Sequence, residues 1–427
     1  MTSSDVFRQP GFLAFWTAGT VSEFGTYVTT IALQVLILTT LDGGAFDVGL
    51  VNGSRWVPYL LFGLVAGALV EHRKRKPLLI ISDLGRGVLL CLIPLLALLG
   101  CLTVPILMAF IAVFGLFSLL NDAATQSFLP RLVPRSSLLP ANARIDQSSS
   151  IAQTFGPAIG GALVTWLSAP VAVLVDAVSY FYSAVVIARI SVQEPSAAPT
   201  DRRLFGDEIR EGLRWVYTHR TLRPVAISTH VWFLFSALLG TVYVPFALLH
   251  EGLNALELGL TLSAAGIGGL IGSLFATRIG LRWGAGRAVI ACYAVMPVGW
   301  VVIELSSLGS PDSAATIGIL ALGQFVFGLA LGASNANEMG YRQAVTPDAL
   351  QGRTNTTMRS FNRAAIIIGA PTGGYLAVTI GYHATLWIGI AGFALATVIL
   401  LASPFRHAQH SDVGTSADDH EHPQSIA

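Results

Sequence analysis

Residues 48–99 read VGLVNGSRWVPYLLFGLVAGALV-EHRKRK-PLLIISDLGRGVLLCLIPLLALL, two apolar runs separated by a short basic segment. At 1.5 Å per residue, the runs 48–70 and 77–99 are each long enough to cross the hydrocarbon core of a bilayer, about 30 Å thick, as a helix. The segment between them carries consecutive Lys and Arg residues from Arg73 to Lys76. This stretch therefore predicts two transmembrane helices joined by a charged loop.

Apolar runs of this kind recur along the whole chain and predict an all-α polytopic membrane protein with twelve transmembrane helices. Apolar residues make up 53% of the sequence and charged residues 11%, against about 25% charged residues in soluble domains. The predicted spans are 12–40, 48–70, 77–99, 104–122, 147–167, 171–191, 225–249, 257–277, 286–307, 314–335, 356–380 and 384–403.

The polar stretch between the sixth and seventh spans divides the chain into two six-helix halves. Apolar residues recur at helical spacing between Leu204 and Val216, with charged residues between them, which predicts an amphipathic helix. We therefore expect an N-terminal six-helix half at 1–191, a cytoplasmic linker with an amphipathic helix at 192–223, a C-terminal six-helix half at 224–403 and a disordered cytoplasmic tail at 404–427.

The basic residues predict the orientation of the chain. Of the 25 Lys and Arg residues, 24 fall on or nearer to one side of the predicted bundle. Connections such as 41–45 and 309–313 have none, whereas the polar linker is rich in arginine. By the positive-inside rule, this asymmetry predicts a multi-pass protein of the cell membrane with both termini in the cytoplasm. The exception is Arg55, whose place inside an apolar run makes it a functional candidate.

The two predicted halves repeat one another. Residues 67–73 and 272–278 share glycine, leucine and arginine at the same spacing. A second, longer repeat has an offset of 213 residues. In it Pro134, Asn142, Gly156, Gly160 and Gly161 recur as Pro347, Asn355, Gly369, Gly373 and Gly374. Duplication of a six-span unit, with a substrate path between the copies, is typical of secondary transporters.

Residues 67–76 carry a family resemblance. They resemble the loop signature Gly-x-Leu-x-Asp-Arg-x-Gly-Arg-Arg/Lys of the major facilitator superfamily, with glutamate at position 71 in place of aspartate. The segments 81–86 and 129–134 are similar to the branch that holds the enterobactin exporter and macrolide efflux proteins. The resemblance implies the major facilitator fold. It also implies gating roles for Gly67, Glu71 and Arg75, because in the family this loop helps to hold the outward-facing state.

The fifth span contains Gly156-Pro157-Ala-Ile-Gly160-Gly161, which resembles the core of the signature of the family's antiporters. Glycine and proline loosen the helical hydrogen-bond ladder, and small residues let a neighbouring helix approach closely. We expect Gly156, Pro157, Gly160 and Gly161 to act in gating, the alternative being plain helix packing.

Three charged residues within the predicted spans are candidates for proton coupling. Glu23 and Arg55 fall at similar depths in the first two spans, and we hypothesise an ion pair that protonation of Glu23 would weaken. The alternative is a permanent structural pair. Asp176 in the sixth span is the second acidic candidate. Asp122 is expected at the inner end of the fourth span, and Arg363 is expected to reach inner water or a partner such as Glu338.

The family fold lines its central cavity with the first, fourth, seventh and tenth helices. The polar and aromatic side chains on these spans suit a large, mostly apolar ligand, and we see no basic cluster of the kind that phosphate sites use. The substrate-binding candidates are Tyr27, Gln34, His230, Trp232, Tyr243, Gln324 and Asn335.

These features together predict a secondary active exporter of hydrophobic drug-like or siderophore-like molecules, driven by proton antiport with rocker-switch alternating access. The alternatives are an uptake symporter or a lipid flippase of the same fold. We expect no enzyme activity, because the spans hold no nucleophile with a base and no metal cluster, and the chain has no Walker-type phosphate loop. The expected partners are the substrate, protons and the bilayer, with no cofactor, metal or nucleic acid, and a monomeric state.

Overall fold

The computed structural model describes residues 6–9, 11–63, 73–192, 205–308, 314–409 and 412, and among these residues there are helices and no strands. Ten of the described helices are long and apolar enough to cross a membrane. They are α1 (Phe12–Thr39), α4 (Arg75–Leu98), α5 (Val104–Leu132), α7 (Ala169–Arg189), α9 (Leu222–Pro245), α10 (Ala255–Trp283), α11 (Ala285–Glu304), α12 (Ala314–Val345), α13 (Asp348–Ile380) and α14 (Tyr382–Leu401).

The two other predicted spans have more polar or broken helices. Helix α6 (Leu138–Leu167) carries Arg144 and Asp146 in its first turns. Helix α2 (Ala45–Ser54) ends where the second span was expected to continue, and the chain resumes a helix over 57–63. Pro58 explains the break, because it has no N–H to donate to the carbonyl of Ser54.

Several helices extend beyond the predicted spans. Helix α5 ends at Leu132 rather than 122, α12 ends at Val345 rather than 335, and α6 and α13 begin earlier than predicted. The apolar pattern locates only the part of a helix that lies in hydrocarbon, and polar turns continue beyond it. Asp122 therefore lies within α5 and not at its end.

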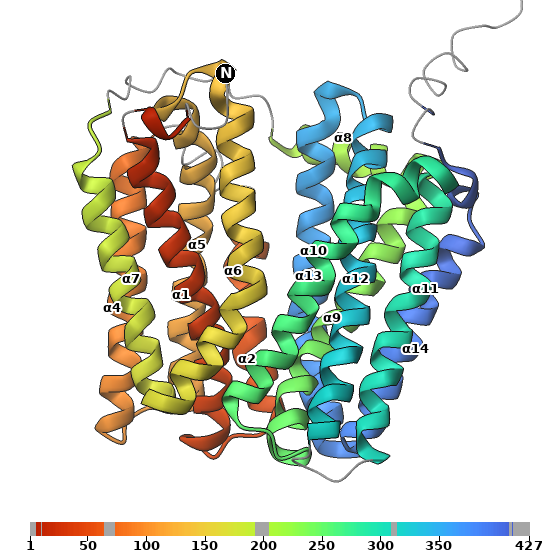
Figure 1. Cartoon of the computed structure of the whole chain (residues 1–427). Coiled ribbons are helices and arrows are strands. Elements are labelled where there is room, and N and C mark those ends of the chain that lie inside the picture. Colours follow the sequence, from red (N-terminus) through yellow and green to blue (C-terminus); the bar gives the residue numbers. More distant parts are fainter. Residues whose placement is uncertain are drawn as a thin grey trace, which may run out of the picture.

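The helices form two bundles (Figure 1). One contains α1, α2 and α4–α7, and the other contains α9–α14. At the end of the molecule that holds the N-terminus, the bundles stand apart; at the opposite end they meet, through α6 against α10 and α2 against α13. We call these ends the N-terminal face and the closed face. The described connections at the closed face have no Lys or Arg, consistent with the predicted charge asymmetry.

Glycines make the contacts between the bundles. A Cβ added to Gly161 of α6 would overlap the carbonyl oxygen of Ala255 at the start of α10. The repeat-related Gly374 of α13 bears the same relation to the carbonyl oxygen of Ala45 at the start of α2. We call these contacts the α6–α10 seam and the α2–α13 seam. At both seams the backbones of the two helices are in contact. The two seams are related by the internal repeat, so equivalent glycines of the two halves make equivalent contacts between the bundles.

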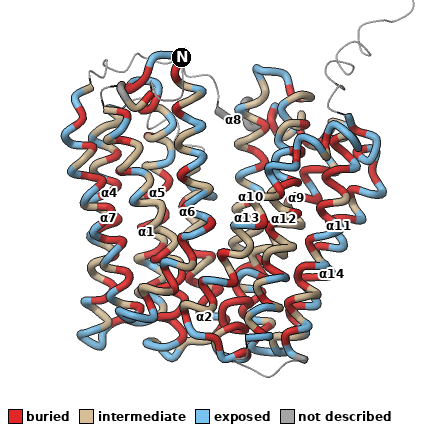
Figure 2. Tube along the Cα trace, viewed as in Figure 1, coloured by how far each residue is buried: buried red, intermediate tan, exposed pale blue. Residues whose placement is uncertain are grey.

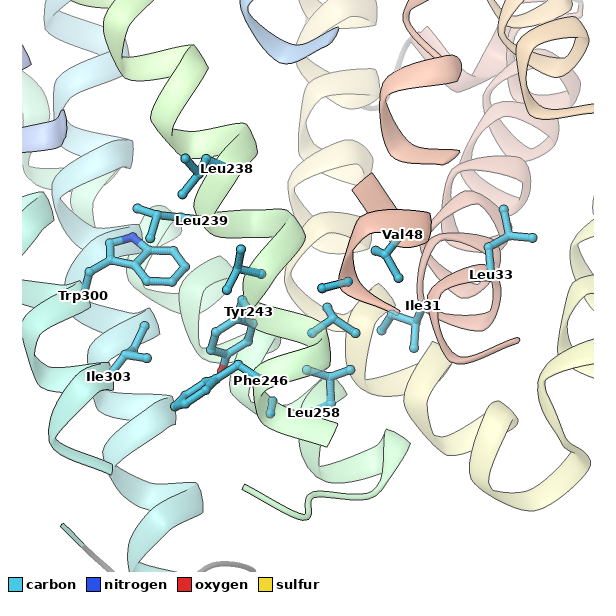
Figure 3. Close-up of a cluster of buried hydrophobic side chains, with 14 of the residues drawn as sticks. Ile31, Leu33, Val48, Leu238, Leu239, Tyr243, Phe246, Leu258, Trp300 and Ile303 are labelled. Carbon is cyan, nitrogen blue, oxygen red and sulfur yellow. The ribbon is translucent and has the colours of Figure 1, made fainter. Parts of the chain in front are cut away.

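Buried residues lie mainly in the interior of the two bundles, whereas exposed residues lie along their outer faces (Figure 2). Many exposed residues are large and apolar, such as Leu98 and Leu274, as expected for a surface that faces lipid. Near the closed face, one apolar cluster draws side chains from both bundles, among them Ile31, Val48 and Tyr243 (Figure 3). This cluster separates the space between the bundles from the closed face.

Helix α8 (Phe205–Thr218) lies within the predicted linker, and it packs on the C-terminal bundle against α13 and α9. Glu211 of α8 forms an ion pair with Arg353 of α13. The start of the predicted disordered tail is instead ordered, because Phe405 of the short helix η5 (Pro404–His407) is fully buried against Tyr341. Apart from Asp412, the tail beyond residue 409 lies outside the described residues.

The seams predict the effect of a larger side chain. Gly161→Val should destabilise the conformation in which the closed face is shut by about 1–3 kcal/mol. A tightly packed contact cannot accommodate added methyl groups without strain. In a cysteine-free background, a cysteine at Ala45, in the other seam, should then react faster with a membrane-impermeant maleimide. Gly318→Val, at a glycine with open space around it, is the control and should leave labelling unchanged. Equal labelling in both variants would show that the seams do not open together.

Candidate transport site

A cavity of about 1170 Å³ lies between the two bundles. Its wall runs from Tyr243 and Val244, near the closed-face end of α9, to Asp146 and Arg359, near the N-terminal-face ends of α6 and α13. The cavity is therefore lined by both halves and extends toward the N-terminal face, while the seams and the apolar cluster shut it off from the closed face.

Six of the seven predicted substrate-binding residues line this cavity. They are Tyr27, Gln34, Trp232, Tyr243, Gln324 and Asn335. The seventh, His230, is not in the cavity wall. Its Nδ1 lies 2.7 Å from Asn362 Oδ1 and its Nε2 lies 2.8 Å from the Tyr217 hydroxyl, so it links α9 to α13 and α8. The sequence placed His230 on the correct helix but could not show which face of that helix it occupies.

Four polar atoms of residues in the cavity wall are buried and have no hydrogen-bond partner among the described residues. These atoms are Gln34 Oε1, Trp300 Nε1, Ser334 Oγ and Arg342 Nε. Buried polar side-chain atoms in native proteins are normally paired, and an unpaired one calls for an explanation. Here the Gln34 oxygen offers an acceptor, the Trp300 and Arg342 nitrogens offer donors, and the Ser334 hydroxyl can do either for a molecule inside the cavity.

Aromatic rings form the apolar part of the wall. Trp300 packs edge-on against Tyr243 and Phe327, and Trp232 stacks on Phe393, which in turn stacks on Phe327. The Trp232 indole also donates to Met296 Sδ at 3.1 Å. These contacts fix the rings in place and present a broad apolar surface with few hydrogen-bonding groups.

The wall also contains a basic cluster, which corrects the sequence-based expectation that none exists. Arg342, Arg359 and Arg363 line the cavity together with Glu338 and Asp146. Arg342 lies beyond the predicted tenth span, because α12 continues to Val345. Arg359 and Arg363 lie inside the predicted eleventh span, but the sequence does not show that they face the same cavity as Arg342. Glu338 pairs with Arg342 at 3.6 Å. Of the two expectations for Arg363, a pair with Glu338 is therefore wrong, while contact with inner water stays a prediction.

The structure does not bring Glu23 and Arg55 together. Glu23 faces α6, where its Oε2 accepts a hydrogen bond of 2.7 Å from Ser149. Among the described residues, no carboxylate lies within ion-pair distance of Arg55, which instead packs near the rings of Trp56 and Phe114. Arg55 lines a small pocket with Thr26, Thr29 and Thr30 of α1, whereas Glu23 is turned to α6.

Asp176 lies at the interface of α7 and α1 and is fully buried. It accepts hydrogen bonds from Thr29 at 2.5 Å and from Ser179 at 2.9 Å. Gly25 of α1 permits this approach, because a Cβ at that position would overlap the carboxylate. Asp176 is therefore a buried carboxylate held by hydroxyl groups of two helices.

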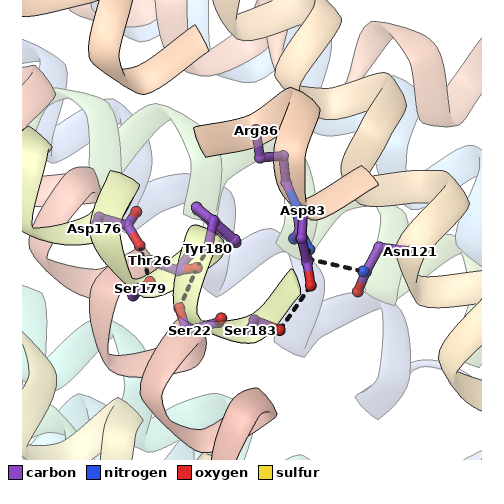
Figure 4. A network of polar contacts seen from close by, with 9 residues as sticks. All are labelled: Ser22, Thr26, Asp83, Arg86, Asn121, Asp176, Ser179, Tyr180 and Ser183. Carbon is purple, nitrogen blue, oxygen red and sulfur yellow. Dashed lines mark hydrogen bonds and ion pairs between the residues drawn. The ribbon is translucent and has the colours of Figure 1, made fainter. Parts of the chain in front are cut away.

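A second polar network, which the sequence analysis did not assign a role, lies beside Asp176 (Figure 4). Asp83 and Arg86 of α4 form a buried ion pair. Ser183 of α7 donates to Asp83 at 2.6 Å, and Arg86 lies 4.3 Å from the ring centre of Tyr180. The sequence does carry a signal for this ion pair. An acid and a base three residues apart in an apolar span lie on one helix face and can therefore pair. The network joins α4, α5, α7 and α1.

The gating candidates divide into two groups. Gly67 and Glu71 lie outside the described residues, and Arg75 is the first residue of α4. The four residues of the fifth span lie at helix contacts: Gly156 and Gly160 against Tyr27 and Val28 of α1, and Pro157 and Gly161 against Gly259 and Ala255 of α10. One helix, α6, thus uses small residues both within its own half and across the seam.

A family model described as transmembrane secretion effector matches residues 2–427. The chain is 28% identical over 391 residues to the multidrug efflux pump Tap of Mycolicibacterium fortuitum, covering 88% of this chain and 91% of that protein. It is 26% identical over 389 residues to Tap of Mycobacterium tuberculosis strain H37Rv, covering 88% and 89% respectively.

Solved structures share the fold. A bacterial homologue of the iron transporter ferroportin in its inward-facing state matches with a TM-score of 0.72 at 16% identity, over 92% of this chain and 98% of that one. Its outward-facing state gives a TM-score of 0.58 at 15% identity, over the same shares. The nucleoside transporter NupG gives 0.72 at 10% identity, over 92% and 98%. The arrangement of two six-helix halves is therefore that of known membrane transporters.

We expect the effects of substituting Asp83 and Arg86 on the free energy of unfolding to be strongly coupled. Asp83→Asn or Arg86→Gln alone should destabilise the protein by about 3–5 kcal/mol, because each leaves an uncompensated buried charge. The double variant should lose less than the sum of the two losses. Thermal unfolding of the purified protein in detergent, analysed as a double-mutant cycle, measures this. Additive losses would contradict a direct pair.

Proposed function

Because the chain belongs to the transmembrane secretion effector family of the major facilitator superfamily, we propose that it exports large, mostly apolar small molecules by proton antiport. The family and the fold are those of membrane transporters. Drug-like and siderophore-like compounds are the substrate classes that fit this proposal. The export direction is supported by the Tap relatives, which are named multidrug efflux pumps.

The observation that carries the proposal is the composition of the cavity. Binding sites for drug-sized molecules are mostly apolar, with a few well-placed polar groups. Here the rings of Trp232, Trp300 and Phe327 supply apolar surface, and Gln34 and Ser334 supply unpaired polar atoms. If the basic N-terminal face lies in the cytoplasm, the cavity is open to the side from which an exporter takes its substrate.

Transport then requires the two halves to rock about the cavity. The seams at Gly161 and Gly374 separate, and the N-terminal-face ends of the bundles approach one another. Small residues suit this motion, because they present no side chains that must disentangle when the backbones part. Gly156, Pro157 and Gly160 extend the same surface along α6, and Gly67, Glu71 and Arg75 are the corresponding gating candidates in the loop after the second span.

For the proton, we assign the first role to Glu23. Its carboxylate accepts a hydrogen bond from the Ser149 hydroxyl and has no ion-pair partner among the described residues, so no paired charge opposes its protonation. Asp176 is the second carrier, and Arg55 is the positive charge that we assign to the same coupling machinery. A proton on Glu23 would change the interaction between α1 and α6, the helix that also forms the seam.

The coupling can be tested in cells. Expression of the chain should lower the accumulation of some members of a panel of antibiotics, dyes and siderophores, and a protonophore should abolish the effect. Glu23→Gln should remove the protonophore-sensitive efflux. Glutamine keeps an acceptor for the Ser149 hydroxyl, but it cannot bind and release a proton near neutral pH. Glu257→Gln is the control, since this carboxylate caps α10 at the closed face, and it should transport normally.

Other outcomes separate the alternatives. Higher accumulation of a compound would favour uptake by symport, and altered lipid distribution with no change for the panel would favour a flippase. Full protonophore-sensitive efflux in Glu23→Gln would reject this residue as the proton carrier and make Asp176→Asn the next test.

The aromatic wall gives a separate prediction. Trp232→Ala should weaken binding of an apolar aromatic substrate about tenfold or more, because it removes roughly 1.5–3 kcal/mol of apolar contact. Trp166→Ala is the matched control, since Trp166 is 74% exposed on the outside of the bundle. Equilibrium binding to the purified protein measures both. Equal affinities in the two variants would place the binding site elsewhere.

A further inference from the structure

We propose that the cavity binds molecules with an anionic group, such as a carboxylate or sulfonate, and that Arg359 and Arg363 of α13 hold this group. This inference rests on the proposed function, because it names a substrate class for the same cavity. It starts from the charges in the cavity wall, which a purely apolar ligand would leave without a partner.

Arg359 and Arg363 lie four residues apart on α13, so their side chains share one face of the helix, and both line the cavity. Neither has a carboxylate within ion-pair distance among the described residues. Like charges at this spacing destabilise a helix. Arg359 is exposed, but Arg363 is only partly exposed, and an unpaired charge within a membrane span is costly and usually functional. An anion between the two guanidinium groups would offset both costs.

The contacts of Arg363 leave its hydrogen-bond donors available. Its guanidinium lies 3.9 Å from the ring centre of Trp56 and 5.4 Å from that of Tyr59, both in the N-terminal half. A ring face attracts positive charge, but it does not provide the paired oxygen acceptors that match a guanidinium fork. The hydroxyl of Tyr59 is directed to Asp122, to which it donates at 2.7 Å.

The remaining charges of the wall direct the anion to α13. Glu338 and Arg342 pair with each other and largely cancel. Asp146 lies on α6, in the other half of the molecule, and would repel an anion from that side. The two unpaired arginines therefore make the α13 side of the cavity the favourable side for negative charge.

This site also lies where the halves meet. Arg363 is one turn from Ile367, whose carbonyl oxygen approaches Gly53 in the α2–α13 seam. An anion bound to Arg363 would compete with the rings of Trp56 and Tyr59 for the guanidinium. Arginine suits this position better than lysine, because its planar fork can stack on a ring and also bind an oxyanion through two hydrogen bonds.

The experiment compares 1-pyrenebutyrate with its methyl ester, two probes that share the apolar ring and differ in charge. Binding to the purified full chain in detergent is followed by energy transfer from tryptophan to pyrene. The wild type should bind the acid at least tenfold more tightly than the ester. In the double variant Arg359→Gln/Arg363→Gln, affinity for the acid should fall at least tenfold and affinity for the ester should stay within about twofold.

Two further variants sharpen the test. Arg363→Lys keeps the charge and should lose part of the preference for the acid. Arg282→Gln removes an exposed basic residue at the end of α10 that does not line the cavity, and it should bind both probes as the wild type does. Loss of acid binding in Arg282→Gln would indicate a general surface effect and overturn the assignment.

Equal affinity of the wild type for acid and ester, unchanged acid binding in the double variant, or no binding of either probe would each overturn the anionic site. None of these results bears on whether the chain exports other compounds, which the accumulation assay decides. Conversely, a clear preference for the acid combined with no efflux of any compound would retain the binding site and reject the proposed export.

Discussion

The structure depends on backbone contact between its two halves at the closed face. At Gly161 against Ala255 and at Gly374 against Ala45, no side chain separates the helices, and a Cβ would overlap a carbonyl oxygen. Contacts this close are sensitive to small displacements, so they favour two discrete arrangements, touching or apart. The internal repeat places one such contact on each side of the cavity, and the halves can therefore close symmetrically about it.

The cavity follows from this constraint. With the halves joined at one face, the long polar ends of α5, α6, α12 and α13 diverge at the other, and the space between them is open to that face. Each half must therefore be rigid enough to move as a unit. In the N-terminal half, the buried network of Asp83, Arg86 and Tyr180 joins its helices by polar contacts that are costly to break in a membrane.

Much of this was predictable from the sequence, because the bilayer imposes a simple pattern. The length of apolar runs gave the helical class, the arginine distribution gave the two faces, and the 213-residue repeat pointed to the glycines of the interface. Side-chain partners were harder to predict. The expected Glu23–Arg55 pair rests on depth alone, but Glu23 turns to Ser149 of α6 instead. Of the basic wall, Arg342 lies beyond the predicted tenth span, and Arg359 and Arg363 lie inside the predicted eleventh span, where the sequence does not show that they face one cavity. His230 lies on the predicted helix but on a face outside the cavity wall.

The central claim is that the two faces open and close in opposition about the glycine seams. Electron paramagnetic resonance distances in proteoliposomes test it directly, with one spin-label pair at Leu139 and Leu281 on the N-terminal face and another at Thr40 and Val378 on the closed face. When a transported compound and a proton gradient are supplied, the first distance should shorten and the second should lengthen in the same population. Unchanged distances, or two distances that lengthen together, would contradict alternating access about the seams.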